Sequence, residues 1–199
     1  MSTVPIGTVP IFADESWRLP SRGRVGMISL IIGETGIFTI FVVAYIYYIG
    51  RTAYGPTPKI LEVPIFNSIC LLSSSITIML AEHAIKHGFV RRFAAWWLLT
   101  MLLGIEFLVG TAIEWRKLIV DDHLTIRTNL FGTTFYSLVG LHATHVIVGL
   151  IGLSLVMLFT LMGRVKQEHA ERIQVLALYW HFVDAVWVVV FTVVYIVGR

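Results

Sequence analysis

The most constraining feature of this chain is a series of five apolar segments, each long enough to cross a lipid bilayer. They span residues 25–49, 64–85, 93–115, 130–162 and 176–198. A hydrocarbon core of about 30 Å requires roughly 20 apolar residues in a helix that rises about 1.5 Å per residue. A bilayer admits only helices or closed barrels, and these segments lack the alternating pattern of barrel strands. The sequence therefore predicts an all-α polytopic membrane protein, a bundle of five transmembrane helices.

The composition supports a membrane protein and excludes several other classes. Hydrophobic residues make up 57% of the chain and charged residues only 14%, whereas roughly 25% of residues are charged in a soluble domain. The Lys and Arg residues lie at the ends of the apolar segments and form no basic stripe, so no nucleic-acid partner is expected. The single cysteine, Cys70, excludes a disulfide framework and a cysteine-based metal cluster held by this chain alone.

The charges at the segment ends predict the orientation. Residues 1–24 contain Pro5, Pro10 and Pro20 and no apolar periodicity, so we expect an irregular cytoplasmic arm before a membrane domain at 25–199. Cytoplasmic loops carry an excess of Lys and Arg, which places the N-terminus inside and the C-terminus outside. The nine predicted inner cations are Arg18, Arg22, Arg24, Lys86, Arg91, Arg92, Arg164, Lys166 and Arg172. The six predicted outer cations are Arg51, Lys59, Arg116, Lys117, Arg127 and Arg199.

Five ionisable side chains lie at membrane depth, where each costs at least about 2.5–3.5 kcal/mol near the centre. Counting along ideal helices places Glu34 about 13 Å, His142 about 12 Å and His145 about 8 Å from the inner face. The same count places His181 about 5 Å and Asp184 about 9 Å deep. These depths predict two level pairs, Glu34 with His142 and His145 with Asp184. Each pair would avoid burying an isolated charge.

Helical spacing predicts which faces turn toward the bundle. His142, His145, Gly149 and Gly152 form one stripe of polar and small residues, which favours close helix packing. Gly33 and Gly36 flank Glu34 and are expected to allow a neighbouring helix to approach. The polar run of segment 64–85 (Asn67, Ser73, Ser74, Ser75 and Thr77) offers interhelical hydrogen bonds.

Four further ionisable residues are secondary candidates. Glu82 and His83 are expected at a wet inner boundary, and Glu114, next to Trp115, is expected to be an outer interfacial anchor. Glu106 is an additional mid-span acid about 20 Å from the inner face, with no histidine at its level. Packing and proton handling both remain open for Glu34. A metal site built from Glu34, His142, His145 and Asp184 is a further alternative.

Ordered motifs along the chain resemble one family of membrane subunits. The segments YWHFVDAVW at 179–187 and FTVVY at 191–195 resemble the last helix of subunit III of the haem-copper terminal oxidases. The segments GTTFY at 132–136 and GLHATHVIVG at 140–149 resemble the preceding helix, and the segment around Glu34 resembles the family's glutamate-bearing helix. Asn67, Leu72–Ser74 and Thr77, and then Leu103, Gly104, Phe107, Glu114 and Trp115, match the two remaining helices. The resemblance covers residues 25–198 and is to the short five-helix bacterial form of the cytochrome c oxidase subunit 3 family.

The resemblance implies a subunit without catalytic residues or cofactors of its own, in an oxidase that reduces O2 and pumps protons. Haems and copper would lie in subunits I and II, the expected partners. Stabilisation of subunit I, support of proton uptake, phospholipid binding and O2 access are the implied roles. The implied location is the bacterial cytoplasmic membrane, where a larger respiratory supercomplex is a further possible partner. Alternatives are subunit III of a quinol oxidase, an accessory subunit of a nitric oxide reductase and, more distantly, an independent proton-coupled transporter.

Overall fold

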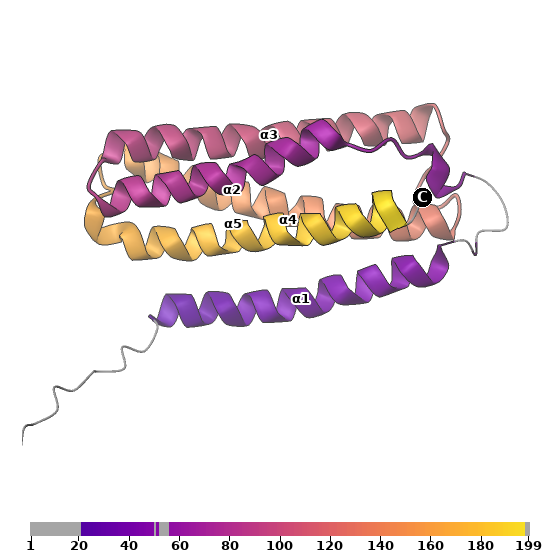
Figure 1. The fold of residues 1–199 in the computed structure, drawn as a ribbon, viewed down its shortest axis with the longest axis horizontal. Coiled ribbons are helices and arrows are strands. Elements are labelled where there is room, and N and C mark those ends of the chain that lie inside the picture. The colour runs from indigo at the N-terminus through magenta and orange to yellow at the C-terminus, as the bar shows by residue number, and fades with distance from the viewer. Residues whose placement is uncertain (1–20, 50, 52–55, 198–199) are drawn as a thin grey trace, which may run out of the picture.

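The computed structural model describes residues 21–49, 51 and 56–197, and long helices make up most of this part of the chain (Figure 1). No strand occurs among these residues. The long helices are α1 (Arg22–Tyr48), α2 (Ile65–Lys86), α3 (Val90–Val120), α4 (Leu130–Leu161) and α5 (Ala170–Phe191). Short helical turns are η1 (Pro58–Ile60), η2 (Gln167–His169) and a π-helix, η3 (Thr192–Val197), that continues α5.

Five helices in the described part of the chain are long and apolar enough to cross a membrane, which confirms the predicted all-α polytopic architecture. Several extend beyond the predicted apolar segments. Helix α3 runs through the charged residues at both of its ends, and α5 begins at Ala170 rather than at residue 176. Helix α1 begins at Arg22, within the segment 1–24 expected to be an irregular arm, and residues 1–20 lie outside the described part of the chain. Hydropathy marks the apolar core of a membrane helix, whereas its hydrogen-bonded ends continue into the polar interface.

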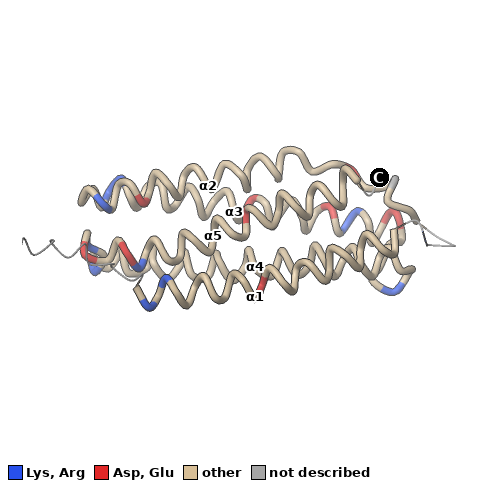
Figure 2. The backbone as a smooth tube through the Cα atoms, turned by 60° about the horizontal axis from the view of Figure 1, so that its bottom comes forward, with Lys and Arg blue, Asp and Glu red and all other residues tan. Residues whose placement is uncertain are grey.

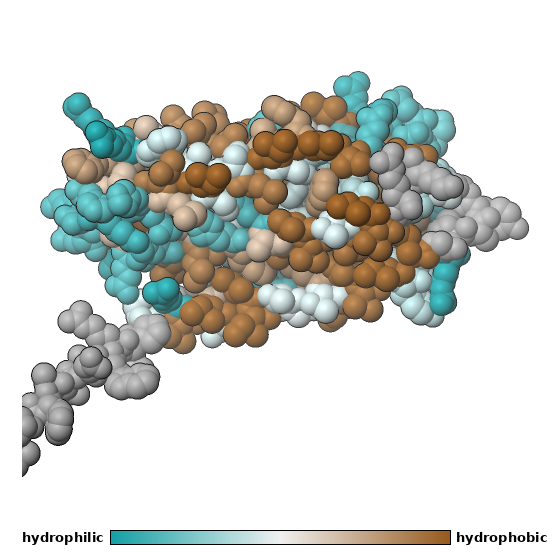
Figure 3. Space-filling view, viewed as in Figure 1, coloured by the Kyte–Doolittle hydropathy of each residue, from teal (hydrophilic) through white to brown (hydrophobic). Residues whose placement is uncertain are grey.

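The helices form an inner group and one peripheral member. Helices α2 and α3 run side by side, and α4 and α5 pack against them (Figure 1). Helix α1 contacts α4 and α5 on the outside of this group, and only Phe38 and Tyr45 of α1 are buried. Figure 2 shows Lys and Arg concentrated at the two ends of the helices, and Figure 3 shows a hydrophobic surface between the hydrophilic ends. This distribution is what a bilayer requires of a multi-pass membrane protein.

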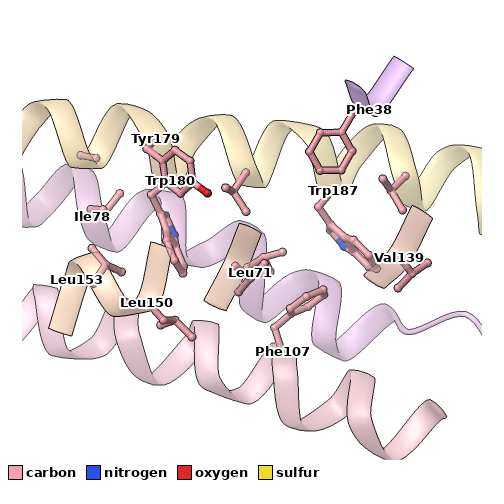
Figure 4. Close-up of a cluster of buried hydrophobic side chains, with 14 of the residues drawn as sticks. Phe38, Leu71, Ile78, Phe107, Val139, Leu150, Leu153, Tyr179, Trp180 and Trp187 are labelled. Atoms are coloured by element: carbon pink, nitrogen blue, oxygen red, sulfur yellow. The ribbon is translucent and has the colours of Figure 1, made fainter. Parts of the chain in front are cut away.

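Tryptophans from α5 fill the centre of the bundle. Trp180 and Trp187 are fully buried and point from α5 toward α3, where Phe107 lies against Trp187 (Figure 4). A Cβ atom added to Gly104 of α3 or to Gly149 of α4 would lie 2.8 Å from ring atoms of Trp180. The indole therefore occupies a space that only glycine leaves open on these two helices. The predicted packing role of Gly149 is thus confirmed.

Candidate functional site

The buried carboxyl group of Asp184 is the centre of the first polar cluster. Asp184 lies on α5, is only 3% exposed, and faces α2. The Ser75 hydroxyl donates a hydrogen bond to Asp184 Oδ2, and Ser74 Oγ lies 3.5 Å from the same oxygen. The second oxygen, Oδ1, has no hydrogen-bond partner among the described residues. One oxygen of a buried acid is therefore held by α2, while the other remains available.

Ser75 connects Asp184 to His181, one helical turn away on α5. His181 Nδ1 lies 3.1 Å from Ser75 Oγ. Because the Ser75 proton is directed at Asp184, the serine oxygen accepts from His181 in the tautomer protonated at Nδ1. His181, Ser75 and Asp184 thus form a hydrogen-bonded chain. Its histidine end is accessible, because His181 lines a hollow of about 680 Å³.

The hollow opens between the ends of α1, α2 and α5. We call the end of the bundle at which this hollow lies the basic end, defined by Arg24, Lys86, Arg91, Arg164 and Arg172. Besides His181, the hollow is lined by Arg24, Glu82, Glu171 and Gln174. The Gln174 side-chain amide donates to Glu82 at 3.5 Å, and Lys86 lies 3.9 Å from the same carboxyl group. Glu82 therefore belongs to the polar wall of this hollow, whereas His83 is exposed and its ring contacts that of His87.

A second polar pair joins the peripheral helix to the bundle. His145 Nε2 on α4 lies 3.1 Å from Glu34 Oε2 on α1, and His145 Nδ1 lies 2.8 Å from the Leu141 carbonyl oxygen. Since Nδ1 must donate to that carbonyl, the carboxyl group and Nε2 share one proton between them. Their side chains are 23% and 13% exposed, so the pair lies at the seam between α1 and α4.

The predicted pairings of Glu34 with His142 and of His145 with Asp184 are both wrong. Depth counting gave no rotation about the helix axes, and this rotation decides which side chains meet. His142 points inward, is fully buried, and packs its ring 5.0 Å from that of Trp187. Neither ring nitrogen of His142 has a hydrogen-bond partner in the part of the chain that the structure describes. Asp184 is directed at the serines of α2, away from His145 on α4.

The structure also bears on two smaller expectations. Glu114, expected to be an outer interfacial anchor, accepts a hydrogen bond at 2.9 Å from Tyr195 and so ties α3 to η3. A Cβ atom added to Gly33 or Gly36 would meet nothing within 4 Å among the described residues, so these glycines do not serve close packing here. Glu106 has one buried oxygen without a partner among the described residues, and it lines a hollow of about 350 Å³ between α2 and α3.

The two clusters do not combine into a metal site. The described residues contain no group of three or more His, Cys, Asp or Glu side chains arranged to hold a metal ion. Glu34 and His145 meet at the seam of α1 and α4, whereas Asp184 meets the serines of α2. The four residues considered for a metal site are therefore distributed over separate interfaces.

Comparison with known proteins decides the family. Residues 20–199 match the family model described as cytochrome c oxidase subunit III. The chain belongs to this family. The cytochrome c oxidase subunit 3 of Alkalihalophilus pseudofirmus is 36% identical over 169 residues, covering 83% of this chain and 82% of that protein. The corresponding protein of Thermostichus vulcanus is 31% identical, covering 99% and 98%, and that of Bacillus sp. PS3 is 30% identical, covering 96% and 94%.

As a member of the subunit III family, this chain is a subunit of a multi-subunit haem-copper oxidase.

Two features of its polar clusters were not predicted from the sequence. Ser75 was expected to serve helix packing, but it connects His181 to Asp184. Ser74 accepts a hydrogen bond at 2.8 Å from the Trp180 indole, which the sequence did not assign. The sequence held one signal for these contacts. Two adjacent serines lie within one apolar segment, and Trp180, His181 and Asp184 lie close together in another.

Proposed function

We propose that this subunit supports proton uptake by its oxidase through the chain His181–Ser75–Asp184. The observation that carries the proposal is that a polar hollow at the basic end leads to a histidine linked through one serine to a buried acid. A buried carboxyl group connected to an accessible polar hollow by hydrogen bonds is suited to proton transfer.

The proton balance of one transfer follows from the hydrogen bonds. A proton from water in the hollow binds His181 at Nε2 and forms an imidazolium. The Nδ1 proton passes to Ser75 Oγ, and the serine's own proton passes to the Asp184 carboxylate. His181 returns to the neutral state as the other tautomer, and Asp184 holds the proton. One proton has then moved from the hollow to the bundle interior.

The remaining parts of the proposal concern the complex. The chain itself carries no redox centre and no catalytic residue, and it stabilises subunit I, with subunit II as a second partner. Bound phospholipid and O2 access through lipid belong to the same role. Cytochrome c is the proposed electron donor, and a larger respiratory supercomplex is a further proposed partner. The basic end faces the cytoplasm of a bacterial cell, which places the N-terminus inside and the C-terminus outside.

The test compares single substitutions in the assembled oxidase. Asp184→Asn removes the proton acceptor, and Ser75→Ala interrupts the chain without removing a charged group. Thr77→Val is the matched control on α2, because Thr77 bonds Thr100 on α3 rather than α5. Proton uptake during turnover is measured in reconstituted vesicles, together with the optical spectrum of the haems. General acid–base groups contribute about 10²–10⁴-fold to a reaction rate when they act directly. Loss of an indirect relay is therefore expected to slow proton uptake by a smaller factor.

The expected result is slower proton uptake in Asp184→Asn and Ser75→Ala, with haem content preserved and Thr77→Val unchanged. Unchanged proton uptake in both Asp184→Asn and Ser75→Ala would overturn the proposal, and so would haem loss from both variant complexes. Proton-coupled flux by the purified subunit alone in liposomes would instead identify a transporter. Co-purification with a nitric oxide reductase rather than with subunit II would assign it to that complex.

A further inference from the structure

The hollow between α2 and α3 holds an acid at the middle of the membrane. It measures about 350 Å³, and every residue that lines it belongs to α2, to α3 or to the turns next to these helices. Helices α1, α4 and α5 contribute nothing to its lining, so the described bundle leaves it uncovered. Glu106, one of the lining residues, lies close to the midpoint of the 31-residue helix α3. We call this the α2–α3 hollow.

The Glu106 carboxyl group has no basic partner among the described residues. Its Oε2 is buried without a hydrogen-bond partner there, and the Cys70 thiol of α2 interacts with the same carboxyl group. A thiol is only a weak donor. The one cationic side chain among the described residues of the lining is Lys117, which is bound to Glu62. Lys117 also lies three helical turns from Glu106, about 16 Å along the axis of α3, and so cannot reach it.

An acid at this depth must be satisfied from outside the chain. Ionisable side chains within membrane spans pair with one another or face a polar interior. Acyl chains, which surround the middle of a span, offer no hydrogen-bond donor. Phospholipid headgroups lie at the interface, about half a helix length away from Glu106. The donor that Glu106 requires is therefore expected on a protein side chain at the same level.

The charge and the surface of the hollow indicate the kind of partner. Its acidic lining residues are Glu62, Glu106, Glu114 and Asp122. With Lys117 as the only basic residue in the described lining, the hollow carries an excess of negative charge, which favours a cationic partner. Val109 and Ile113 follow Glu106 on the same face of α3 and are 52% and 65% exposed. An apolar helix packed there would cover both side chains.

We propose that the α2–α3 hollow receives one transmembrane helix of a neighbouring oxidase subunit, and that a Lys or Arg of this helix pairs with Glu106. The aliphatic part of such a side chain lies along Val109 and Ile113 while its charged group reaches the carboxyl group. Asn67 adds a polar group at this level, because its side chain covers Gly110, one turn from Glu106, where a Cβ atom would clash with it. The inference goes beyond the proposed function and does not use the chain His181–Ser75–Asp184.

The experiment identifies the partner by photocrosslinking in the assembled oxidase. A benzophenone amino acid replaces Ile113, which lines the hollow and is exposed, and crosslinked peptides are mapped by mass spectrometry. The matched control position is Ile147, which is 46% exposed on α4, a helix that does not line the hollow. The expected product at Ile113 is a transmembrane peptide of another subunit that contains Lys or Arg. The control position should not yield this peptide.

The test variant for the ion pair is Glu106→Gln, which removes the charge and keeps the size of the side chain. Removing one partner of a buried charge pair should lower the crosslink yield at Ile113 by roughly tenfold or more. The control variant is Glu62→Gln, which removes the same charge from the same hollow, where the Glu62 side chain is 78% exposed. Exposed ion pairs contribute little, so its crosslink yield should stay close to that of the wild type.

A charge exchange keeps the proposal testable if Glu106→Gln fails to assemble, which the haem spectrum of the purified complex reports. Glu106→Lys combined with Glu in place of the identified cation should restore the crosslink that each change alone weakens. Labelling of lipid alone at Ile113, a crosslink to a second copy of this chain, or a crosslinked helix without Lys or Arg would overturn the proposal. Unchanged yield in Glu106→Gln, or no recovery in the exchange, would also overturn it. None of these outcomes depends on proton uptake, so the test is separate from that of Asp184.

Discussion

The indole N–H of Trp180 donates a hydrogen bond to Ser74 Oγ at 2.8 Å, across the interface of α5 and α2. The same serine donates at 2.6 Å to the Leu71 carbonyl of its own helix. Both side chains are fully buried, so a large ring is fixed at the bundle centre by one polar contact and two facing glycines. The position of α5, and with it of His181 and Asp184, depends on this contact.

Substitution of Ser74 by alanine should destabilise the subunit by about 1–3 kcal/mol, because the Trp180 N–H would stay buried without an acceptor. The matched control is Ser73→Ala, since Ser73 donates only to the Cys70 carbonyl of its own helix. The free energy of unfolding of the subunit in mixed micelles, measured by titration with a denaturing detergent, checks the difference. Equal destabilisation by the two substitutions would contradict the assigned role of Ser74.

Substitution of Gly149 by alanine should cost about 1–3 kcal/mol, as expected for overpacking a well-filled interior. The added Cβ would lie 2.8 Å from two ring carbons of Trp180, which cannot move without breaking its bond to Ser74. Gly33→Ala is the control, because a Cβ there meets nothing within 4 Å among the described residues. The same unfolding assay should show Gly33→Ala to be neutral or stabilising. A stable Gly149→Ala variant would show that the tryptophan has room to shift.

The pairing of Glu34 with His145 predicts a measurable coupling energy. In a double-mutant cycle of Glu34→Gln and His145→Gln, we expect a coupling between about 0.6 and about 1.7 kcal/mol, the mean and the maximum found for hydrogen bonds between membrane helices. The cycle of Glu34→Gln with His142→Gln should show a coupling near zero, since no hydrogen bond or ion pair joins those two side chains. A larger coupling of Glu34 with His142 than with His145 would instead support the pairing predicted from depth alone.

Removal of the Tyr195 hydroxyl should loosen the end of α5. Tyr195→Phe deletes the 2.9 Å hydrogen bond to Glu114 and leaves a half-buried carboxyl group without its donor, at a cost of about 1–2 kcal/mol. Hydrogen exchange of the backbone amides in η3 should become faster, whereas exchange in α2 should not change. Tyr47→Phe is the control, because Tyr47 is exposed on α1. Unchanged exchange in η3 would show that packing alone holds this segment.

The sequence predicted the number, type and approximate extent of the helices because a bilayer imposes length and apolarity on every span. It predicted less well which side chains meet. Glu34 contacts His145 rather than His142, a difference of less than one turn of α4 that the rotation of α4 about its axis decides. The glycine stripe of α4 was assigned correctly, since Gly149 and Gly152 face large side chains of α5. Gly33 and Gly36 on α1 suggested close packing in the same way, but no described residue lies within 4 Å of a Cβ added there. The spacing of glycines does not reveal which helix lies opposite them.

The peripheral position of α1 has a consequence for biogenesis. Ribosomes make this helix before its packing partners, α4 and α5, which come last among the spans. After release from the translocon, α1 must remain in lipid as an independent helix until the final two spans have inserted. Helix association in membranes can follow insertion as a separate stage. Helix α1 is therefore made first but can dock only after α4 has been made, and the Glu34–His145 seam closes late in synthesis.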